Sequence, residues 1–342
     1  MPSIKYIIVG LGSIGQRHCT NLLSFGVNEN EIGVVRRKNG TNPFGDTYLK
    51  KHPEIQIYDD LDKALETKPR AVFVTNPTSL HLKTALASAR AGSHLFIEKP
   101  ISTSIDRELG ELAVETERRN LVVLTGYYIR FNPLLQAIKQ WIDDGKLGNI
   151  VSIQTEMSGR MPTWHPWEDY RTSYIASDGM SGGVILSLNH VIDLVYWFIG
   201  MPHEVYASSG TLGGFDIDTE DTADIMMHYK KGLTASVHLD YIKDPGSTFI
   251  EVTGTKGAVR WNIGDTKITL KFFDSKDTLE SSVSNDFERN TMFLYEMKHF
   301  LDCIKNNKKS SIDLAQGKDV LAISLAARQS AKYHNKLITI AK

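Results

Sequence analysis

The sequence predicts an α/β fold, with an N-terminal Rossmann-type doubly wound parallel sheet and a C-terminal α+β domain carrying a large, mostly antiparallel open sheet. The chain has 342 residues, which is enough for about two domains. Up to about residue 124, short apolar runs alternate with helical segments, as in a parallel sheet with crossover helices. After residue 204, segments of alternating polar and apolar residues follow one another through short turns. We therefore expect two domains, at 1–124 and at 125–342, of which the first contains the parallel sheet and the second the antiparallel one.

The composition argues against several classes of protein. Hydrophobic residues make up 41% of the chain and charged residues 23%, and the formal net charge is -1, so nothing favours nucleic acid or an anionic membrane as partner. Two cysteines, Cys19 and Cys303, cannot build a disulfide framework or a zinc cluster. The N-terminal apolar run is short, interrupted by glycines and lacks a signal-type cleavage region. We expect a cytoplasmic protein without a metal site.

A glycine motif opens the chain and organises the first domain. The apolar run Lys5–Val9 reads as a buried strand and leads into Gly10-x-Gly12-x-x-Gly15, after which a helical apolar face begins. In this context the first glycine allows a tight turn, the second lets backbone N–H groups approach a pyrophosphate, and the third lets the helix pack on the strand. The alternative is a purely structural glycine-rich turn. The expected cofactor contacts here are Gly10, Gly12, Ser13, Ile14 and Gly15.

The end of the second predicted strand, 31–35, bears on cofactor choice. NAD-specific sites usually place an acidic residue at this point to hold the ribose 2′-hydroxyl. This chain has Arg36 and Arg37 instead. A guanidinium can pair with a 2′-phosphate or stack on adenine, which favours NADP over NAD. The alternative is a solvated basic loop.

Polar residues follow the later strands of the first domain at the edge where such sheets bind ligands. Thr75 and Asn76 follow the strand 71–74, and His81 begins the next helix. Glu98 and Lys99 follow the strand 95–97, and a charged pair at a buried strand end is costly unless it is used. The alternative is a surface ion pair. The remaining elements expected here are strands at 55–58 and 121–124 and helices at 61–65, 81–91 and 106–119.

The second domain contributes an aromatic loop and a histidine-bearing helix. In the loop 160–174, Trp164 can stack on a sugar ring and Arg171 can hold a phosphate or carboxylate, although the tryptophans can equally cap the core. On the predicted helix 182–200, His190 and Asp193 share a face, so that Asp193 can orient the imidazole. A satisfied core histidine is the alternative. The other expected elements are helices at 131–143, 291–305 and 314–334, a loop at 274–288, and strands at 150–156, 204–211, 222–229, 233–241, 247–253, 257–262 and 267–273.

Together the motifs resemble the Gfo/Idh/MocA oxidoreductases over essentially the whole chain. They are the glycine motif, Glu98-Lys99-Pro100, the joining segment 126–133, and Gly182-Gly183 followed by His190. The resemblance implies a nicotinamide-dependent enzyme that acts on a sugar, polyol or related alcohol. It implies that Glu98 lies near the nicotinamide ribose and that Lys99 and His190 are catalytic. The residues expected at the substrate are Arg130, Trp164, Arg171, Asn189 and Asp193.

Two departures from the family pattern leave alternatives open. Leu186 stands where many members carry an aspartate, and Tyr128 replaces a common asparagine. A cofactor-retaining sugar epimerase or lyase of the same fold, or a non-enzymatic NAD(P)-binding sensor, therefore stay possible. The loop 160–174 is similar to one in members linked to surface-glycan and nucleotide-sugar biosynthesis. The family commonly assembles through its open sheet, which implies a homodimer or homotetramer.

Overall fold

The chain forms two compact units in the computed structural model, which describes residues 4–36, 43–164, 169–177 and 182–340. The first unit comprises the described residues of 1–127 and 293–318, and the second those of 128–292 and 319–342. The predicted cofactor contact Arg37 lies outside the described residues. Among the described residues, no helix is both long and apolar enough to cross a membrane.

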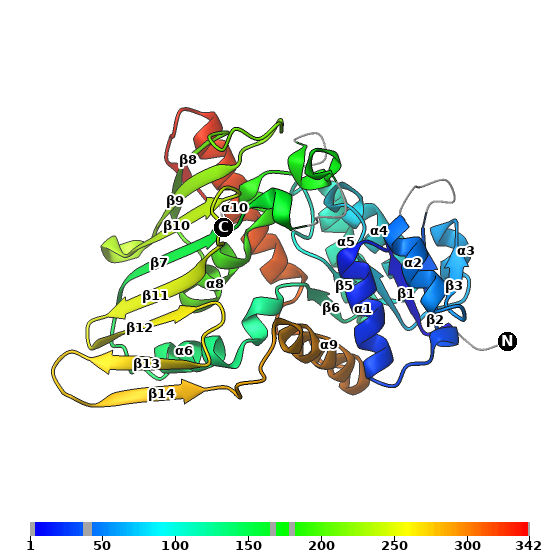
Figure 1. Cartoon of the computed structure of the whole chain (residues 1–342), viewed down its shortest axis with the longest axis horizontal. Helices are drawn as coiled ribbons and strands as arrows, with labels where there is room; N and C mark the ends of the chain where they lie inside the picture. The colour runs from blue at the N-terminus through cyan, green and yellow to red at the C-terminus, as the bar shows by residue number, and fades with distance from the viewer. Residues whose placement is uncertain (1–3, 37–42, 165–168, 178–181, 341–342) are drawn as a thin grey trace. The chain divides into compact units, whose positions relative to one another are not determined.

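The first unit is built on a parallel sheet with strand order β3-β2-β1-β4-β5-β6 (Figure 1). The order changes direction between β1 and β4, which makes the carboxyl ends of these two strands the point where doubly wound sheets bind ligands. Every residue of β1 and β4 is buried, as expected for central strands covered on both faces. The predicted fold class is confirmed for this unit. The strands are β1 (Tyr6–Val9), β2 (Ile32–Val35), β3 (Gln56–Tyr58), β4 (Ala71–Val74), β5 (His94–Ile97) and β6 (Val123–Thr125).

The starts of the crossover helices in the first unit are explained by ordinary helix-capping residues. Asp60 and Asp106 accept hydrogen bonds from backbone N–H groups at the starts of their helices, as N-cap residues do. One helix begins at Pro43, between the predicted strands 31–35 and 55–58, where the sequence predicts no helix. Glycine and proline there obscured the helix, although proline is well suited to a first helical turn. The helices are α1 (Ser13–Ser24), α2 (Pro43–Lys51), α3 (Leu61–Leu65), α4 (His81–Arg90) and α5 (Arg107–Arg118).

Residues from near the C-terminus complete the core of the first unit. The helix α9 (Arg289–Asn306) places Phe300 edge-on against Phe73 and Phe96, with ring centroids 5.6 and 5.5 Å apart. Figure 1 shows α9 beside α1, and the guanidinium of Arg17 lies over the ring of Phe293. The residues from Tyr128 to Met292 belong to the second unit, and the chain returns to the first unit at Phe293. The aromatic contacts then hold α9 against the parallel sheet.

The second unit carries a nine-stranded sheet with the order β14-β13-β12-β11-β7-β10-β9-β8-β15. Neighbouring strands pair antiparallel except β7 and β10, which are parallel, so the sheet is mostly antiparallel as predicted. The turn at 230–232 joins β9 and β10 in the hairpin that the sequence indicates. The strands are β7 (Ile150–Ser158), β8 (Glu204–Gly210), β9 (Thr222–His228), β10 (Thr234–Asp240), β11 (Thr248–Gly254), β12 (Gly257–Asn262), β13 (Lys267–Phe272), β14 (Thr278–Ser282) and β15 (Ile338–Thr339).

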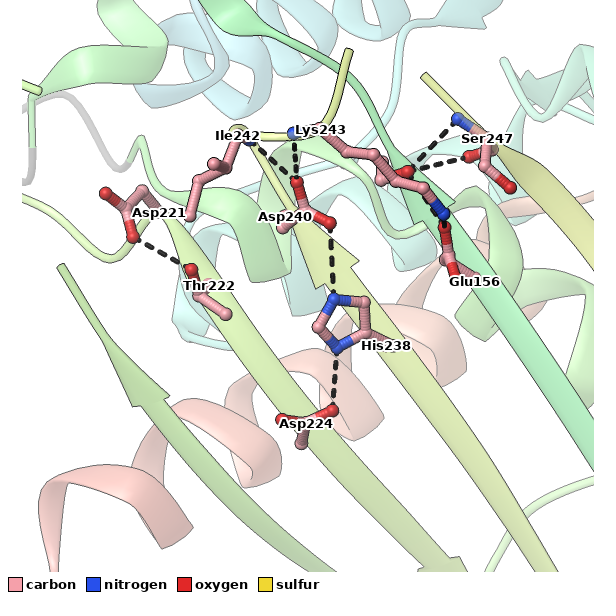
Figure 2. A network of polar contacts seen from close by, with 10 residues as sticks. Glu156, Asp221, Thr222, Asp224, His238, Asp240, Ile242, Lys243 and Ser247 are labelled. Carbon is pink, nitrogen blue, oxygen red and sulfur yellow. Dashed lines mark hydrogen bonds and ion pairs between the residues drawn. The ribbon is translucent and has the colours of Figure 1, made fainter. Parts of the chain in front are cut away.

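Helices cover one face of this sheet. α8 contacts β7 and β10, and α6 contacts β12 and β14. Burial alternates along the strands, as in β11, so that every second side chain lies on the opposite, open face. Figure 2 shows a polar network on that face, in which His238 lies between Asp224 and Asp240. The helices are α6 (Pro133–Asp143), α7 (Val184–Ser187), α8 (His190–Ile199) and α10 (Leu314–Lys332), whose residues up to Lys318 belong to the first unit.

Two sequence predictions for the second unit are wrong in detail. The helix expected at 182–200 is interrupted at Leu188 and Asn189, so that α8 starts at His190 itself. The segment 274–288, expected to be a loop, contains β14, which pairs with β13. β14 is an edge strand with mostly polar side chains. Its pairing with β13 depends on backbone hydrogen bonds, which produce no hydrophobic pattern in the sequence.

Candidate functional site

The glycine turn between β1 and α1 is closely packed. Gly10 has φ +96°, and a Cβ there would lie 2.9 Å from backbone atoms of Asn76. A Cβ on Gly15 would lie 2.1 Å from the carbonyl oxygen of Gly10, so the helix start packs directly on the turn. Neither position accepts a side chain without moving the backbone.

The second glycine of the motif faces open space. Gly12 is the N-cap residue of α1, and a Cβ there would meet nothing within 4 Å. No side chain of the described residues caps this end, and the first turn of α1 has no acidic residue. The free N–H groups and the positive end of the helix dipole are therefore available to an anion. Ser13 and Ile14, the other expected contacts, form the start of the same helix.

Thr75 and Asn76 tie the end of β4 to this turn. The Thr75 hydroxyl lies 3.0 Å from the Val9 carbonyl oxygen and 2.8 Å from that of Gly10. The Asn76 amide donates to Thr84 at 2.9 Å, while its Oδ1 is buried and has no hydrogen-bond partner among the described residues. A buried amide oxygen without a partner is unusual, and a ligand with a hydroxyl or amide donor would satisfy it.

The basic residue at the end of β2 is already paired. Arg36 donates from Nη1 to Oδ1 of Asp46, on the first turns of α2, at 2.5 Å. The Arg36 side chain is 17% exposed and that of Asp46 is 52% exposed. A 2′-phosphate would therefore compete with a carboxylate for this guanidinium.

The charged turn after β5 is held from two helices. His18 of α1 contacts Glu98, with Nε2 and Oε1 2.8 Å apart. His81 of α4 has Nδ1 2.9 Å from the Pro100 carbonyl oxygen and Nε2 2.7 Å from that of Asn76. Burial lowers the pKa of His81, against the effect of these two carbonyls. A hydrogen bond from His81 to a cofactor would require one of these backbone contacts to break, and the cofactor contact of His81 stays a prediction.

In the second unit, Arg130 and Asp193 join the segment before α6 to α8. Arg130 donates from Nε to Oδ2 at 2.8 Å and from Nη2 to Oδ1 at 2.5 Å, with the two side chains 4% and 1% exposed. Burial raises the pKa of Asp193, and the guanidinium opposes that rise. Asp193 thus pairs with Arg130, whereas the sequence suggested that it orients His190.

His190 opens α8 in an enclosed setting. It is 5% exposed, and the ring of Tyr128 lies edge-on to it at 4.8 Å between centroids. Arg289 donates from Nε to the Tyr128 hydroxyl at 3.2 Å. Asn189, the N-cap residue of α8, is fully buried, and Leu186 is 1% exposed. Of the two departures from the family pattern, Tyr128 places an aromatic ring against His190, and Leu186 is a buried apolar side chain on α7.

The two candidates from the aromatic loop make contacts of their own. Trp164 packs edge-on against the buried Tyr241 at 5.3 Å, which is the core-capping alternative. Arg171 holds Asp169 through both Nε and Nη2, and its guanidinium lowers the pKa of that carboxyl group. Both side chains of this pair are exposed, so it can open at little cost.

The residues of the first unit fit a dinucleotide cofactor. Gly12 leaves space at the N-terminus of α1, and Asn76 offers a buried oxygen that has no partner in the described part of the chain, at the end of the neighbouring strand. Thr75, Glu98 and Lys99 belong to the same edge of the sheet. No group of acidic, histidine and cysteine side chains within the described ranges could hold a metal ion.

Family models match both parts of the chain. A model described as the oxidoreductase family with an NAD-binding Rossmann fold matches residues 4–127, and a GFO/IDH/MocA C-terminal domain model matches residues 135–260. The chain belongs to the Gfo/Idh/MocA family. The predicted family, the enzyme class of NAD(P)-dependent oxidoreductase and the nicotinamide cofactor are thereby confirmed.

Similar proteins of this Gfo/Idh/MocA type extend over the full length of the chain. Myo-inositol 2-dehydrogenase of Thermotoga maritima is 25% identical, with 94% of this chain and 95% of the relative covered. Levoglucosan dehydrogenase, solved with NADH and levoglucosan, has a TM-score of 0.83 at 18% identity, covering 99% of this chain and 100% of that one. The WlbA dehydrogenase from Bordetella pertussis, solved with NADH and UDP-GlcNAcA, has a TM-score of 0.79 at 20% identity, with both chains fully covered.

Sequence reasoning missed three side chains that the structure attaches to the candidate residues. They are His18 at Glu98, Asp46 at Arg36, and Arg289 at Tyr128. His18 follows the last glycine of the motif by three residues, which was the available signal. Arg289 is distant from Tyr128 in the sequence, and Asp46 lies on a helix that the sequence did not predict.

Proposed function

We propose that this protein transfers a hydride between NADP(H) or NAD(H) and the carbon that carries a hydroxyl group in a sugar, polyol or sugar derivative. The observation that carries the proposal is the carboxyl edge of the parallel sheet. There, the glycine turn, Asn76 and the Glu98-Lys99 pair follow β1, β4 and β5. The inositol and levoglucosan dehydrogenases among the similar proteins support a polyhydroxylated substrate.

The chain's own residues would orient the cofactor and move one proton. When bound, the nicotinamide ring accepts or supplies the hydride. In the oxidative direction, the C–H bond electrons leave with the hydride and the hydroxyl loses its proton to a base, which leaves a carbonyl. We assign that base to Lys99, with His190 of the second unit polarising the same oxygen. In the reverse direction, the same groups return the proton.

The contacts in the second unit support distinct roles for its candidates. Arg130 and Asp193 fix the start of α8, on which His190 lies. Asn189 is adjacent to His190 and remains proposed for the substrate. Contacts of Trp164 and Arg171 with substrate also remain proposals, and each requires the side chain to leave or share its present neighbour.

The preference for NADP over NAD stays a proposal as well. It rests on Arg36, the one described cation at the end of β2, and on Asp46 being exposed enough to release it. The alternative retains Arg36 with Asp46 and lets the guanidinium stack on adenine, which would favour neither cofactor strongly.

A homodimer or homotetramer through the open face of the nine-stranded sheet is proposed as the assembly. Some of the charges on this face are paired with one another: Lys243 with Glu156, and His238 with two aspartates (Figure 2). Internally paired charges can be covered by a second copy at low cost. A cytoplasmic location is proposed because both cysteines are free thiols.

The test of the function begins with purified protein stripped of cofactor. NADPH and NADH are titrated by nicotinamide fluorescence, and inositols, hexoses, anhydrosugars and nucleotide sugars are then screened for substrate-dependent change in cofactor absorbance. The expected result is binding of a nicotinamide cofactor and its stoichiometric reduction by at least one polyhydroxylated substrate. Isomerised or dehydrated product with no net change in the cofactor would instead identify the cofactor-retaining reaction. Absence of turnover despite tight binding would favour a sensor.

A further inference from the structure

His18 makes a closed contact with Glu98 inside the first unit. The imidazole is fully buried, with its ring centroid 4.6 Å from that of Phe96 and 5.4 Å from that of Phe73. Its Nε2 lies 2.8 Å from Oε1 of Glu98, whose side chain is 12% exposed. Two aromatic rings and one carboxylate therefore determine the plane of the imidazole.

The surroundings of the ring determine where its proton lies. Nδ1 of His18 is buried and has no hydrogen-bond partner among the described residues. A proton on Nδ1 would be a buried donor without an acceptor, which costs about 1–3 kcal/mol. The neutral ring with its proton on Nε2 avoids this cost and donates to Glu98. Oε1 of Glu98 then accepts this hydrogen bond.

The carboxylate of Glu98 is held on its other side as well. Its Oε2 accepts from the backbone N–H of Lys99 at 3.3 Å. A Cβ on Gly126 would lie 3.0 Å from Oε2, so glycine at that position leaves the room that the carboxylate occupies. The side chain consequently has one supported orientation, and the N–H of the next residue takes part in it.

The contact joins two functional elements. His18 lies on α1, the helix whose N-terminus forms the glycine turn, and Glu98 directly precedes Lys99. We propose that His18 is a positioning residue that sets the location of the Glu98-Lys99 turn relative to the cofactor-binding helix. This inference rests on the proposed function for the role of Lys99. The inference goes beyond the proposed function because it assigns a positioning role to a histidine that touches neither the reacting carbon nor the lysine side chain.

The kinetic experiment compares variants of His18 with a matched control. His18→Leu removes the donor, His18→Gln supplies an amide N–H of similar reach, and His18→Asn supplies one that is too short. The control is His52→Leu, because His52 makes a histidine–glutamate contact of the same 2.8 Å length with Glu29 on the surface of this unit. Each protein is assayed for NADPH dissociation constant, kcat, KM and thermal unfolding.

The expected result separates positioning from folding. His18→Leu and His18→Asn should lower kcat about 100-fold, since displacement by 1 Å can cost that much, while their NADPH dissociation constants stay within about threefold, or ~0.7 kcal/mol. His18→Gln should recover most of kcat, and His52→Leu should leave kcat unchanged. Equal kcat for His18→Leu and His52→Leu would overturn the proposal. If His18→Leu does not fold, the difference between His18→Gln and His18→Asn decides the question.

A second measurement requires no substrate. Nitrogen NMR of the imidazoles, with the His18 signal assigned from the His18→Gln spectrum, should show a neutral ring protonated at Nε2. Glu98→Gln should preserve this state, and Glu98→Leu should change it. A charged ring, or a proton on Nδ1, would contradict the proposal. If the wild-type protein oxidises no sugar or polyol, the proposed function fails, while this readout still decides whether His18 holds Glu98.

Discussion

Arg130 and Asp193 form a two-point ion pair that is almost completely removed from solvent, with both contacts at 2.8 Å or less. The guanidinium also lies 5.9 and 5.6 Å from the ring centroids of Tyr196 and Trp197. The pair connects the segment that follows the first unit in sequence to the helix that begins with His190.

Breaking this pair from either side should strongly destabilise the protein. Asp193→Asn leaves a buried guanidinium without a counter-charge, and Arg130→Met leaves a buried carboxylate, so each should cost about 3–5 kcal/mol of unfolding free energy in urea. The double variant Arg130→Met/Asp193→Leu should cost clearly less than either single one. Asp143→Asn, which breaks the exposed pair of Lys139 on α6, is the control and should change stability by less than about 1 kcal/mol. If either single variant lowers the free energy of unfolding as little as Asp143→Asn does, the stabilising role assigned to the Arg130–Asp193 pair is wrong.

Lys99→Ala should abolish turnover while leaving NADPH binding largely intact. Lys99 follows β5 at the edge that carries the glycine turn, whereas the groups proposed to bind the pyrophosphate belong to α1. Lys99→Arg should also be inactive, because a guanidinium does not release its proton near neutral pH. Steady-state assays and fluorescence titration measure the two properties separately, with Lys63→Ala, in an exposed pair with Asp59, as control. Normal turnover by Lys99→Ala would remove this residue from the mechanism.

Asp46→Asn should shift cofactor preference towards NADPH. The substitution frees Arg36 from its carboxylate and removes a negative charge near the expected 2′-phosphate. The gain should be about fivefold in the ratio of NADH to NADPH dissociation constants, as expected for ~1 kcal/mol from a partly exposed pair. Arg36→Ala should lower the same ratio. Asp59→Asn breaks another surface pair of this unit and should leave the ratio unchanged. Unaltered preference in both Asp46→Asn and Arg36→Ala would mean that Arg36 does not meet the 2′-position.

His238→Gln should lose more stability at pH 6 than at pH 9. Partial burial lowers the pKa of His238, but the hydrogen bonds and charges of Asp224 and Asp240 outweigh it and the net shift is upward. A raised folded-state pKa contributes stability that is complete below the ordinary value near 6.5 and is lost as the pH rises through the folded-state value.

The experiment measures urea unfolding of wild type and His238→Gln across this pH range. His238 pairs with Asp224 of β9 and Asp240 of its own strand, and its register partner on β7 is Glu156, which is paired with Lys243. Ser236→Ala, which removes a side chain without a titratable group from the same strand, is the control and should show no such pH dependence. A difference between wild type and His238→Gln that stays constant from pH 6 to 9 would show that the ring is neutral throughout.

The sequence predicted correctly those features that depend on residues close to one another in the chain. The strand, three glycines and helix of the first turn are consecutive, and the structure contains them as predicted. Alternating burial in β10 and β11 likewise follows from the period of the strand. Local signals were weaker where backbone pairing alone defines the element. β14 has mostly polar side chains and is defined by its pairing with β13. The break between α7 and α8 falls at Leu188 and Asn189, whose side chains stay buried, so the hydrophobic pattern does not reveal it.

By itself, then, the sequence determined the family, the two types of sheet and the residues at the ends of β1, β4 and β5. Only the tertiary structure decided which side chains the candidate and core residues contact. Glu98 meets His18 across 80 residues, Asp193 meets Arg130 across 63, and Phe300 reaches the aromatic core of the first unit. Periodicity and motif spacing depend on near neighbours in the chain, whereas these contacts depend on how strands and helices pack. For that reason the contacts and orientation of the candidate residues could be described only once the fold was known.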